Sequence, residues 1–129
     1  MSSYIYDTRF FIEYFYTKDK NLQRKMRDNL REARKRLISV ITLHEVYKLT
    51  LEREGRETAK LRVTVLGRDF KVVNVDSKIA VEAAEIRSKH RIPMADSIIA
   101  ATAKMLNLPV ITDDKHFYKI KDIKATWIK

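Results

Sequence analysis

The sequence predicts an α/β protein of three layers (α/β/α), in which helices cover both faces of a central, mostly parallel sheet of four to five strands. Two observations support this prediction. Short apolar segments alternate along the 129 residues with longer segments that have a helical spacing of apolar residues, an alternation typical of parallel sheets with crossover helices. No repeat, low-complexity tract or linker-like segment interrupts the pattern, so one domain over residues 1–129 is expected.

The first part of the chain predicts a strand, two helices and a second strand. Residues 3–6 are β-prone, and residues 8–16 carry aromatic side chains on one broad side, as expected for a helix. In the basic segment 18–36, apolar residues recur every three or four positions, which predicts an amphipathic helix. Residues 37–40 predict the second strand. The apolar stripe of the basic segment is Leu22, Met26, Leu30, Ala33 and Leu37.

Two further helices and a strand are expected in the middle of the chain. Residues 42–54 and 57–66 have helical character, and each segment is followed by a glycine, Gly55 or Gly67. Glycine is the residue preferred in the left-handed conformation that ends many helices, so both helices are expected to end there. The apolar, β-branched residues 70–75 predict the third strand.

The last third of the chain repeats the alternation of helix and strand. Residues 79–89 and 94–106 predict helices, the second with an alanine-rich face that permits close packing and with Asn107 as a left-handed end. Residues 110–112 follow a proline and predict a strand. Residues 125–128 predict a short final strand.

Composition and charge narrow the classes of function. The chain has 27 Lys and Arg against 17 Asp and Glu, a net charge of +10. This charge favours polyanionic partners, chiefly nucleic acid, although it also suits membrane surfaces, acidic proteins or simple solubility. The chain has no cysteine, no stretch of about 18 apolar residues and no signal-peptide pattern at its start. We therefore expect a cytoplasmic protein that is not a membrane protein.

Four acidic residues, Asp7, Glu45, Asp96 and Asp114, lie at the ends of apolar runs or at the starts of helical ones. Because ligands of a parallel sheet bind outside the carboxyl ends of its strands, all four side chains can meet at one edge. Carboxylates so close repel one another, and a divalent cation would compensate their charge. Since the donors would all be oxygens, Mg²⁺ or Mn²⁺ is expected rather than zinc or copper. Such a site can activate water for the hydrolysis of a phosphodiester, while basic residues hold the polyphosphate strand.

Each acid also has a structural interpretation. Asp7 can cap the helix of residues 8–16, and Asp96 can favour the start of its own helix. Glu45 can be an exposed acid of a first helical turn, and the pair Asp113 and Asp114 can form a simple turn. If each acid had only a structural role, however, the position of all four at the same end of one sheet would be a coincidence.

The histidines and glycines offer no competing chemistry. His44, His90 and His116 are far apart in the sequence, and none pairs with a serine or cysteine in a pattern typical of a catalytic triad. We therefore interpret all three as surface or edge residues. With only two glycines, the chain has no glycine-rich phosphate loop.

The order and spacing of these motifs resemble those of PIN domains, and among them the single-domain toxins of the VapC type. The resemblance covers essentially the whole chain and is most specific in residues 95–103 together with the following Thr-x-Asp-x-x-Phe. The matching stretches are Tyr6-Asp7-Thr8 with Phe10-Phe11-Ile12, residues 39–46, Ala95-Asp96-Ser97-Ile98-Ile99-Ala100-Ala101-Thr102-Ala103, and Val110-Ile111-Thr112-Asp113-Asp114 with Phe117.

The resemblance implies a Mg²⁺- or Mn²⁺-dependent endoribonuclease that cuts single-stranded RNA, usually as a homodimer that a cognate antitoxin silences. It carries metal ligation onto Asp7, Asp96, Asp114 and Glu45, and it implies catalytic roles for all four. Supporting roles fall on Thr8, on Thr112, which can orient water or an acid, and on Asp113, which can supplement or replace Asp114. The candidates for contact with RNA are Arg9, Lys25, Arg34, Lys35 and Arg36.

Three alternatives stay open at this point. A PIN-like scaffold can bind RNA or a protein without cutting, and a free-standing PIN nuclease can lack an antitoxin. A phosphotransfer protein built on Asp7 is a weaker option, because no second aspartate follows two residues on.

Overall fold

The computed structural model describes residues 2–128 and contains a five-stranded sheet in the order β3-β2-β1-β4-β5. All four strand pairings in this described part are parallel. The strand order reverses at β1, with β2 and β3 on one side of it and β4 and β5 on the other. The strands are β1 (Ser3–Tyr6), β2 (Lys35–Ser39), β3 (Lys71–Val73), β4 (Val110–Ile111) and β5 (Ala125–Thr126).

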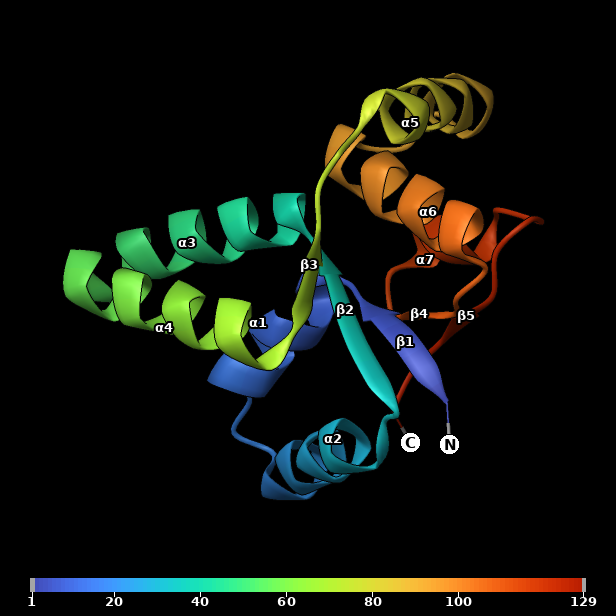
Figure 1. Ribbon diagram of the computed structural model, residues 1–129. Helices are drawn as coiled ribbons and strands as arrows, with labels where there is room; N and C mark the ends of the chain where they lie inside the picture. The colour runs from blue at the N-terminus through green and yellow to red at the C-terminus, as the bar shows by residue number, and fades with distance from the viewer. Residues whose placement is uncertain (1, 129) are drawn as a thin grey trace.

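Helices cover both faces of this sheet, so the predicted three-layer α/β architecture is confirmed (Figure 1). Alternate residues of β1 face opposite layers, as the pleat of a strand requires. Ile5 belongs to the apolar cluster that includes residues of α5 and α6, whereas Tyr6 belongs to the cluster with α1 and α4. The helices are α1 (Thr8–Tyr16), α2 (Lys20–Glu32), α3 (Val40–Glu54), α4 (Arg56–Asp69), α5 (Ser77–His90), α6 (Met94–Leu106) and α7 (Lys115–Tyr118).

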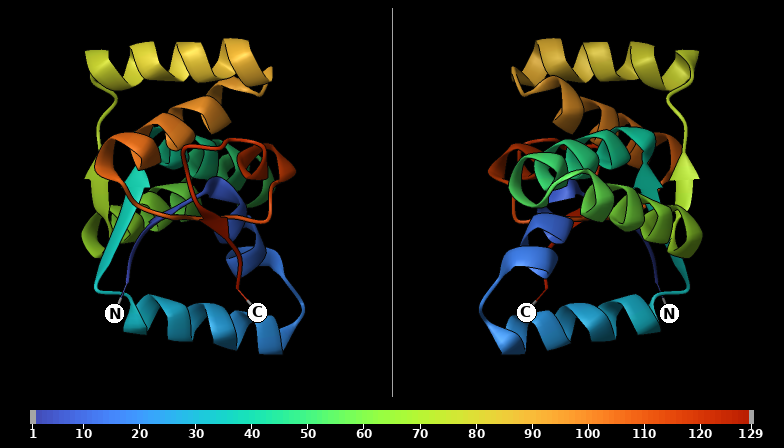
Figure 2. Two further views of the ribbon diagram at one scale, coloured as in Figure 1. Left: turned by 90° about the vertical axis from the view of Figure 1, so that its right-hand side faces the viewer. Right: turned by 90° about the vertical axis from the view of Figure 1, so that its left-hand side faces the viewer.

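The two ends of the sheet differ in what surrounds them. Helix α2 lies at the amino edge, by which we mean the end of the sheet where the parallel strands begin. There the backbone amide of Arg34 donates a hydrogen bond to the carbonyl of Ser2 at 2.8 Å. Figures 1 and 2 place α2 at the end of the molecule opposite α5. At the carboxyl edge, β1 ends at Tyr6 and its neighbour β4 ends at Ile111. Because the strand order reverses here, this edge offers the crevice in which parallel sheets bind ligands.

The second strand and the helix after it begin earlier than predicted. The basic helix ends at Glu32, and β2 already starts at Lys35, so Leu37 belongs to the strand rather than to the helical stripe. The hydroxyl of Ser39 accepts a hydrogen bond from the amide of Ile41, which starts α3 at Val40. As a result Glu45 lies in the second turn of α3, where a first-turn position was expected.

The two glycines also differ from the expectation. Helix α4 continues through Gly67 to Asp69, and φ is positive at Gly55 but not at Gly67. Gly55 does end α3 with a φ of 94°, but its ψ of 174° lies outside the left-handed helical region. Asn107 adopts the left-handed conformation expected of it, with φ 54° and ψ 50°. The short helix α7 was not predicted.

Strands β3, β4 and β5 are shorter than the apolar runs that predict them, because only two or three residues of each run pair with a neighbouring strand. No helix within residues 2–128 has the length and apolar character needed to cross a bilayer.

Candidate active site at the carboxyl edge of the sheet

Asp7 directly follows β1 and is the most buried acid of the site, with 2% of its surface exposed. Although it precedes α1, its side chain makes no capping hydrogen bond, so the interpretation of Asp7 as a helix cap is wrong. Instead its Oδ2 accepts a hydrogen bond from the Thr112 hydroxyl at 2.7 Å. Burial raises the pKa of Asp7 to about 7; the charges of Asp96 and Asp114 raise it further, and the Thr112 hydrogen bond opposes them.

Thr112 links the two neighbouring strands β1 and β4 through one hydroxyl. While this hydroxyl donates to Asp7, it also accepts a hydrogen bond from the backbone amide of Asp114 at 3.0 Å. Thr112 is fully buried, so water cannot replace either bond. The expectation that Thr112 orients an acid therefore agrees with its contacts.

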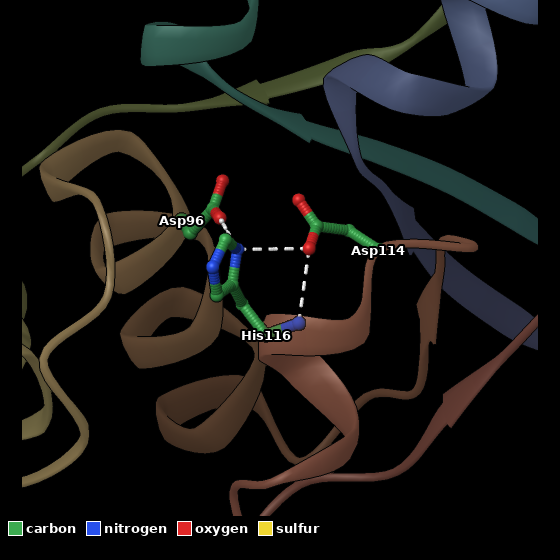
Figure 3. A group of neighbouring side chains, drawn as sticks. All are labelled: Asp96, Asp114 and His116. Carbon is green, nitrogen blue, oxygen red and sulfur yellow. Dashed lines mark hydrogen bonds and ion pairs between the residues drawn. The ribbon is translucent and has the colours of Figure 1, made fainter.

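Asp96 and Asp114 come together around a histidine (Figure 3). Asp114 caps α7 by accepting the backbone amide of His116 at 2.9 Å. The ring nitrogen Nδ1 of His116 lies 2.9 Å from Asp114 Oδ1 and 3.0 Å from Asp96 Oδ2. Burial raises the pKa of Asp96 to about 6, the charge of Asp114 acts in the same direction, and His116 opposes both.

The interpretation of the three histidines as surface or edge residues did not foresee the contacts of His116 with Asp96 and Asp114. One sequence feature could have placed His116 at the site: it lies two residues after Asp114, at the start of the unpredicted helix α7. In a capped first turn, the side chain at that position can turn back toward the capping carboxylate.

Glu45 reaches the same edge from α3, although it does not join the closest group of acids. Its Oε1 accepts a hydrogen bond from the Thr8 hydroxyl at 2.5 Å, and Thr8 directly follows Asp7 in the chain. The side chain of Glu45 is half-buried. Thr8 therefore fixes Glu45 beside the end of β1, as Thr112 fixes Asp7.

Asp113 and Arg9 bind each other across the rim of the site. The guanidinium of Arg9 donates to both oxygens of Asp113, at 3.0 and 3.2 Å, and lies 3.4 Å from Glu13. Asp113 thus points to Arg9, whereas Asp114 is the residue that joins Asp96. Of the two interpretations of Asp113, replacement of Asp114 is not supported.

The donor set at this edge fits a divalent cation. Within residues 2–128, one ligand atom each from Asp96, Asp114 and His116 lies within 4.8 Å of the others. Two neighbouring carboxylates beside a ring nitrogen form a site that a cation would stabilise, because it would compensate their negative charge. Asp7 lies next to this group through Thr112, and its pKa responds to the charges of Asp96 and Asp114. Beside the carboxylate oxygens that the sequence predicts, the group of candidate donors includes a histidine nitrogen.

The basic residues proposed for RNA contact, Arg9 apart, lie at the other edge of the sheet. Lys25 belongs to α2, and Arg34 and Lys35 stand at the start of β2, all three exposed. Arg36 is partly buried and donates to the carbonyls of Leu30 and Asp69 at 2.9 and 3.1 Å. Its guanidinium also lies 5.9 Å from the ring centre of Phe70. Among the four, Arg36 is thus the one whose guanidinium is held by contacts within the protein.

Comparisons with known proteins agree with this architecture. The family model of the PIN domain matches residues 4–123. Ribonuclease VapC4 of Mycobacterium tuberculosis is 30% identical over 98 residues, which cover 70% of this chain and 75% of that protein.

Two solved structures illustrate the likeness of fold. The DNA-bound VapBC from Salmonella typhimurium has a TM-score of 0.79 at 22% identity and covers 98% of each chain. The sarcin-ricin loop cleaving toxin VapC20 of Mycobacterium tuberculosis has a TM-score of 0.76 at 18% identity, over 91% of this chain and 94% of that one. From the match of the family model and of the ribonuclease relative, this chain belongs to the PIN-domain family, with VapC proteins among its relatives.

Proposed function

We propose that this protein is a divalent-metal-dependent endoribonuclease that hydrolyses phosphodiester bonds of single-stranded RNA, and that it is the toxin of a toxin–antitoxin pair. The observation that carries the proposal is the meeting of Asp96 and Asp114 at the carboxyl edge, with Thr112 joining the buried Asp7 to the backbone of Asp114. The relative named as a ribonuclease and the net charge of +10 support RNA as the substrate class.

The position of each residue in the site indicates its role. Asp96 and Asp114, with Asp7 beside them, would hold the cation. When bound, a divalent cation supplies Lewis acidity to a phosphate oxygen and lowers the pKa of a coordinated water. Thr112 and Thr8 fix the carboxylates of Asp7 and Glu45 before substrate arrives, which limits reorganisation during the reaction.

The same geometry argues against two other interpretations, a phosphotransfer protein and a binding module without activity. Phosphotransfer to Asp7 requires an accessible carboxylate, whereas Asp7 is 2% exposed and hydrogen-bonded. A binding module without activity would gain nothing from holding three carboxylates together, because the burial that raises the pKa of Asp7 and Asp96 destabilises the fold.

Partners follow from the same proposal. One structural relative was solved as VapBC bound to DNA, and another is named as a toxin. We accordingly propose a cognate antitoxin and a homodimeric state, which co-purification with the product of a neighbouring gene and light scattering of the isolated chain would test.

Asp96→Asn tests the metal-dependent activity. This change removes one ligand charge at nearly unchanged volume, so cleavage of a single-stranded RNA should fall on the order of 10³-fold or more. EDTA should abolish wild-type cleavage, and added Mn²⁺ or Mg²⁺ should restore it. The matched control is Asp122→Asn, since the side chain of Asp122 is 65% exposed and pairs with Lys104.

Circular dichroism should show the same secondary structure in both variants and in the wild type. Cleavage by Asp96→Asn at the wild-type rate would overturn the proposal. RNA binding that EDTA does not affect, with no product at any Mn²⁺ concentration, would instead support the non-catalytic binding module.

A further inference from the structure

The imidazole of His116 occupies a central position between two carboxylates of the proposed metal site. Its Nδ1 lies within hydrogen-bonding distance of both Asp96 Oδ2 and Asp114 Oδ1, at 3.0 and 2.9 Å. A ring nitrogen has at most one proton, so it cannot make a full hydrogen bond to both oxygens at once. Each side chain is only partly exposed: 39% for His116, 15% for Asp96 and 22% for Asp114.

The backbone holds this ring in place. Asp114 Oδ1 accepts the backbone amide of His116 at 2.9 Å and contacts the ring nitrogen of the same residue. The next residue, Phe117, is fully buried in the apolar cluster with α5 and α6. Nδ1 is therefore presented to the two carboxylates by an anchored turn, which is how a preorganised ligand is held.

The distances suit a bound ion as well as they suit hydrogen bonds. With metal–ligand bonds of about 2.1 Å, neighbouring ligands of an octahedral ion lie about 3.0 Å apart and opposite ligands about 4.2 Å apart. The separations of Nδ1 from the two oxygens match the shorter value, and one ligand atom from each of the three residues lies within 4.8 Å of the others. An ion bound to Nδ1 and to these two carboxylates would thus require little movement of the side chains.

We propose that His116 Nδ1 is a direct ligand of the metal, and that this nitrogen gives the site a preference for Mn²⁺ over Mg²⁺. Imidazole is a poor ligand for the hard Mg²⁺ ion, whereas first-row transition ions accept mixed nitrogen and oxygen donors. The inference rests on the proposed function for the presence of a divalent ion, and it adds the identity of one ligand and the order of preference.

A competing arrangement uses the same contacts differently. A protonated imidazole between two carboxylates can stand in for the cation and leave when a metal binds. Removal of His116 would then strengthen metal binding, whereas removal of a ligand weakens it. The sign of the change in affinity therefore separates the two arrangements.

The experiment uses the full chain without RNA and measures binding of Mn²⁺ by electron paramagnetic resonance, with Mg²⁺ as competitor. In the wild type, pulsed spectra should contain hyperfine coupling from a directly bound nitrogen. His116→Ala should remove this coupling and lower the Mn²⁺ affinity by about tenfold or more, the smaller end of the losses seen when a side chain supporting a metal site is removed. The affinity for Mg²⁺ should fall by less than the affinity for Mn²⁺.

Two further variants sharpen the test. His116→Asn places an amide near the position of Nδ1, so an oxygen donor can replace the nitrogen. This variant should still bind metal, without nitrogen coupling and with a lower preference for Mn²⁺. The control is His44→Asn, because His44 is exposed on α3, and its spectra and affinities should match the wild type.

The outcomes separate this inference from the proposed function. Equal affinity for the two ions with no nitrogen coupling in the wild type overturns the role of His116 and leaves the nuclease intact. Tighter Mn²⁺ binding by His116→Ala also overturns it, in favour of the displaced imidazole. If neither ion binds the wild type, the proposed function itself fails.

Discussion

The carboxyl and amino edges of the sheet carry opposite charges in opposite environments. At the carboxyl edge, a few acids are buried or half-buried, and each is bound by a hydroxyl or by an imidazole. At the amino edge, α2 and the start of β2 carry many cations, nearly all exposed. The number of charges is greater at the amino edge, yet the features of a reactive site are at the carboxyl edge.

The difference lies in what the environment does to each charge. Exposed lysines and arginines stay solvated, so their charges cost the fold little free energy. Their electrostatic interactions change mainly with the salt concentration. The burial of Asp7 and Asp96 raises the pKa of both, to about 7 and about 6, because water no longer stabilises their charge and Asp114 lies close by. A cluster that is unfavourable without a counter-ion is a better guide to function than a dense but solvated face.

The largest expected effect comes from Asp7→Asn at the carboxyl edge. Cleavage of RNA should fall on the order of 10³-fold, because the site loses a buried carboxylate of the metal group. In EDTA at neutral pH, however, the free energy of unfolding should rise by about 1–3 kcal/mol, since a neutral amide removes the electrostatic penalty. Urea unfolding and a cleavage assay measure both. A variant that loses stability as well as activity would contradict the view that this edge is held under strain.

The second prediction concerns pH. Unfolded Asp7 loses its proton near its ordinary pKa of 3.8, whereas the native pKa is about 7. Between these values the native state binds more protons, so the stability of the metal-free protein should decrease as pH rises from about 4 to about 7. A decrease of about 2–4 kcal/mol is expected, and Asp96 acts in the same direction.

Urea unfolding in EDTA across this range measures the decrease. Mn²⁺ should reduce it, and Asp7→Asn should flatten the profile. The exposed Glu54 and Asp69 have lowered pKa values that act in the opposite direction, though solvent weakens their effect. Stability that rises with pH in the metal-free wild type would contradict the assigned environment of Asp7.

The smallest effects are expected at the amino edge. Arg36→Gln should lower the free energy of unfolding by about 1–2 kcal/mol, because two backbone carbonyls lose their donor. The matched change Lys25→Gln, at an exposed position of α2, should alter stability by less than about 0.5 kcal/mol. Neither change should lower the cleavage rate constant by more than about twofold at moderate salt, since these side chains lie away from the acids. A large loss of cleavage in Lys25→Gln would mean that the bound RNA extends to this edge.

Local sequence patterns were sufficient for much of the fold. The apolar period of the segments predicted all five strands and the longer helices. The placement of Asp7 and of the pair Asp113 and Asp114 at the carboxyl ends of strands predicted the edge at which Asp7 and Asp114 meet. Boundaries were less certain because they depend on single contacts. Ser39 starts α3 by capping it, and Gly67 stays within α4 although glycine often ends a helix.

The composition of the site could not be read in full from the chain. The hydroxyl of Thr112 and the carboxylate of Asp7 are 105 positions apart in sequence, and Arg9 and Asp113 are 104 apart. These pairs form because β1 and β4 are neighbours in the sheet. The contact of His116 with Asp96 depends on the unpredicted helix α7, which carries His116, and on the packing of α6, which brings Asp96 to it.

The sequence by itself determined the alternation of strands and helices, the excess of basic charge and the positions of the acids at strand and helix ends, since these depend on neighbours along the chain. Only the tertiary structure decided which acids come together, that a histidine nitrogen lies among them and that the basic helix lies at the far edge. The reason is that contacts between side chains depend on strand order and helix packing, and both are set by the burial of the core as a whole.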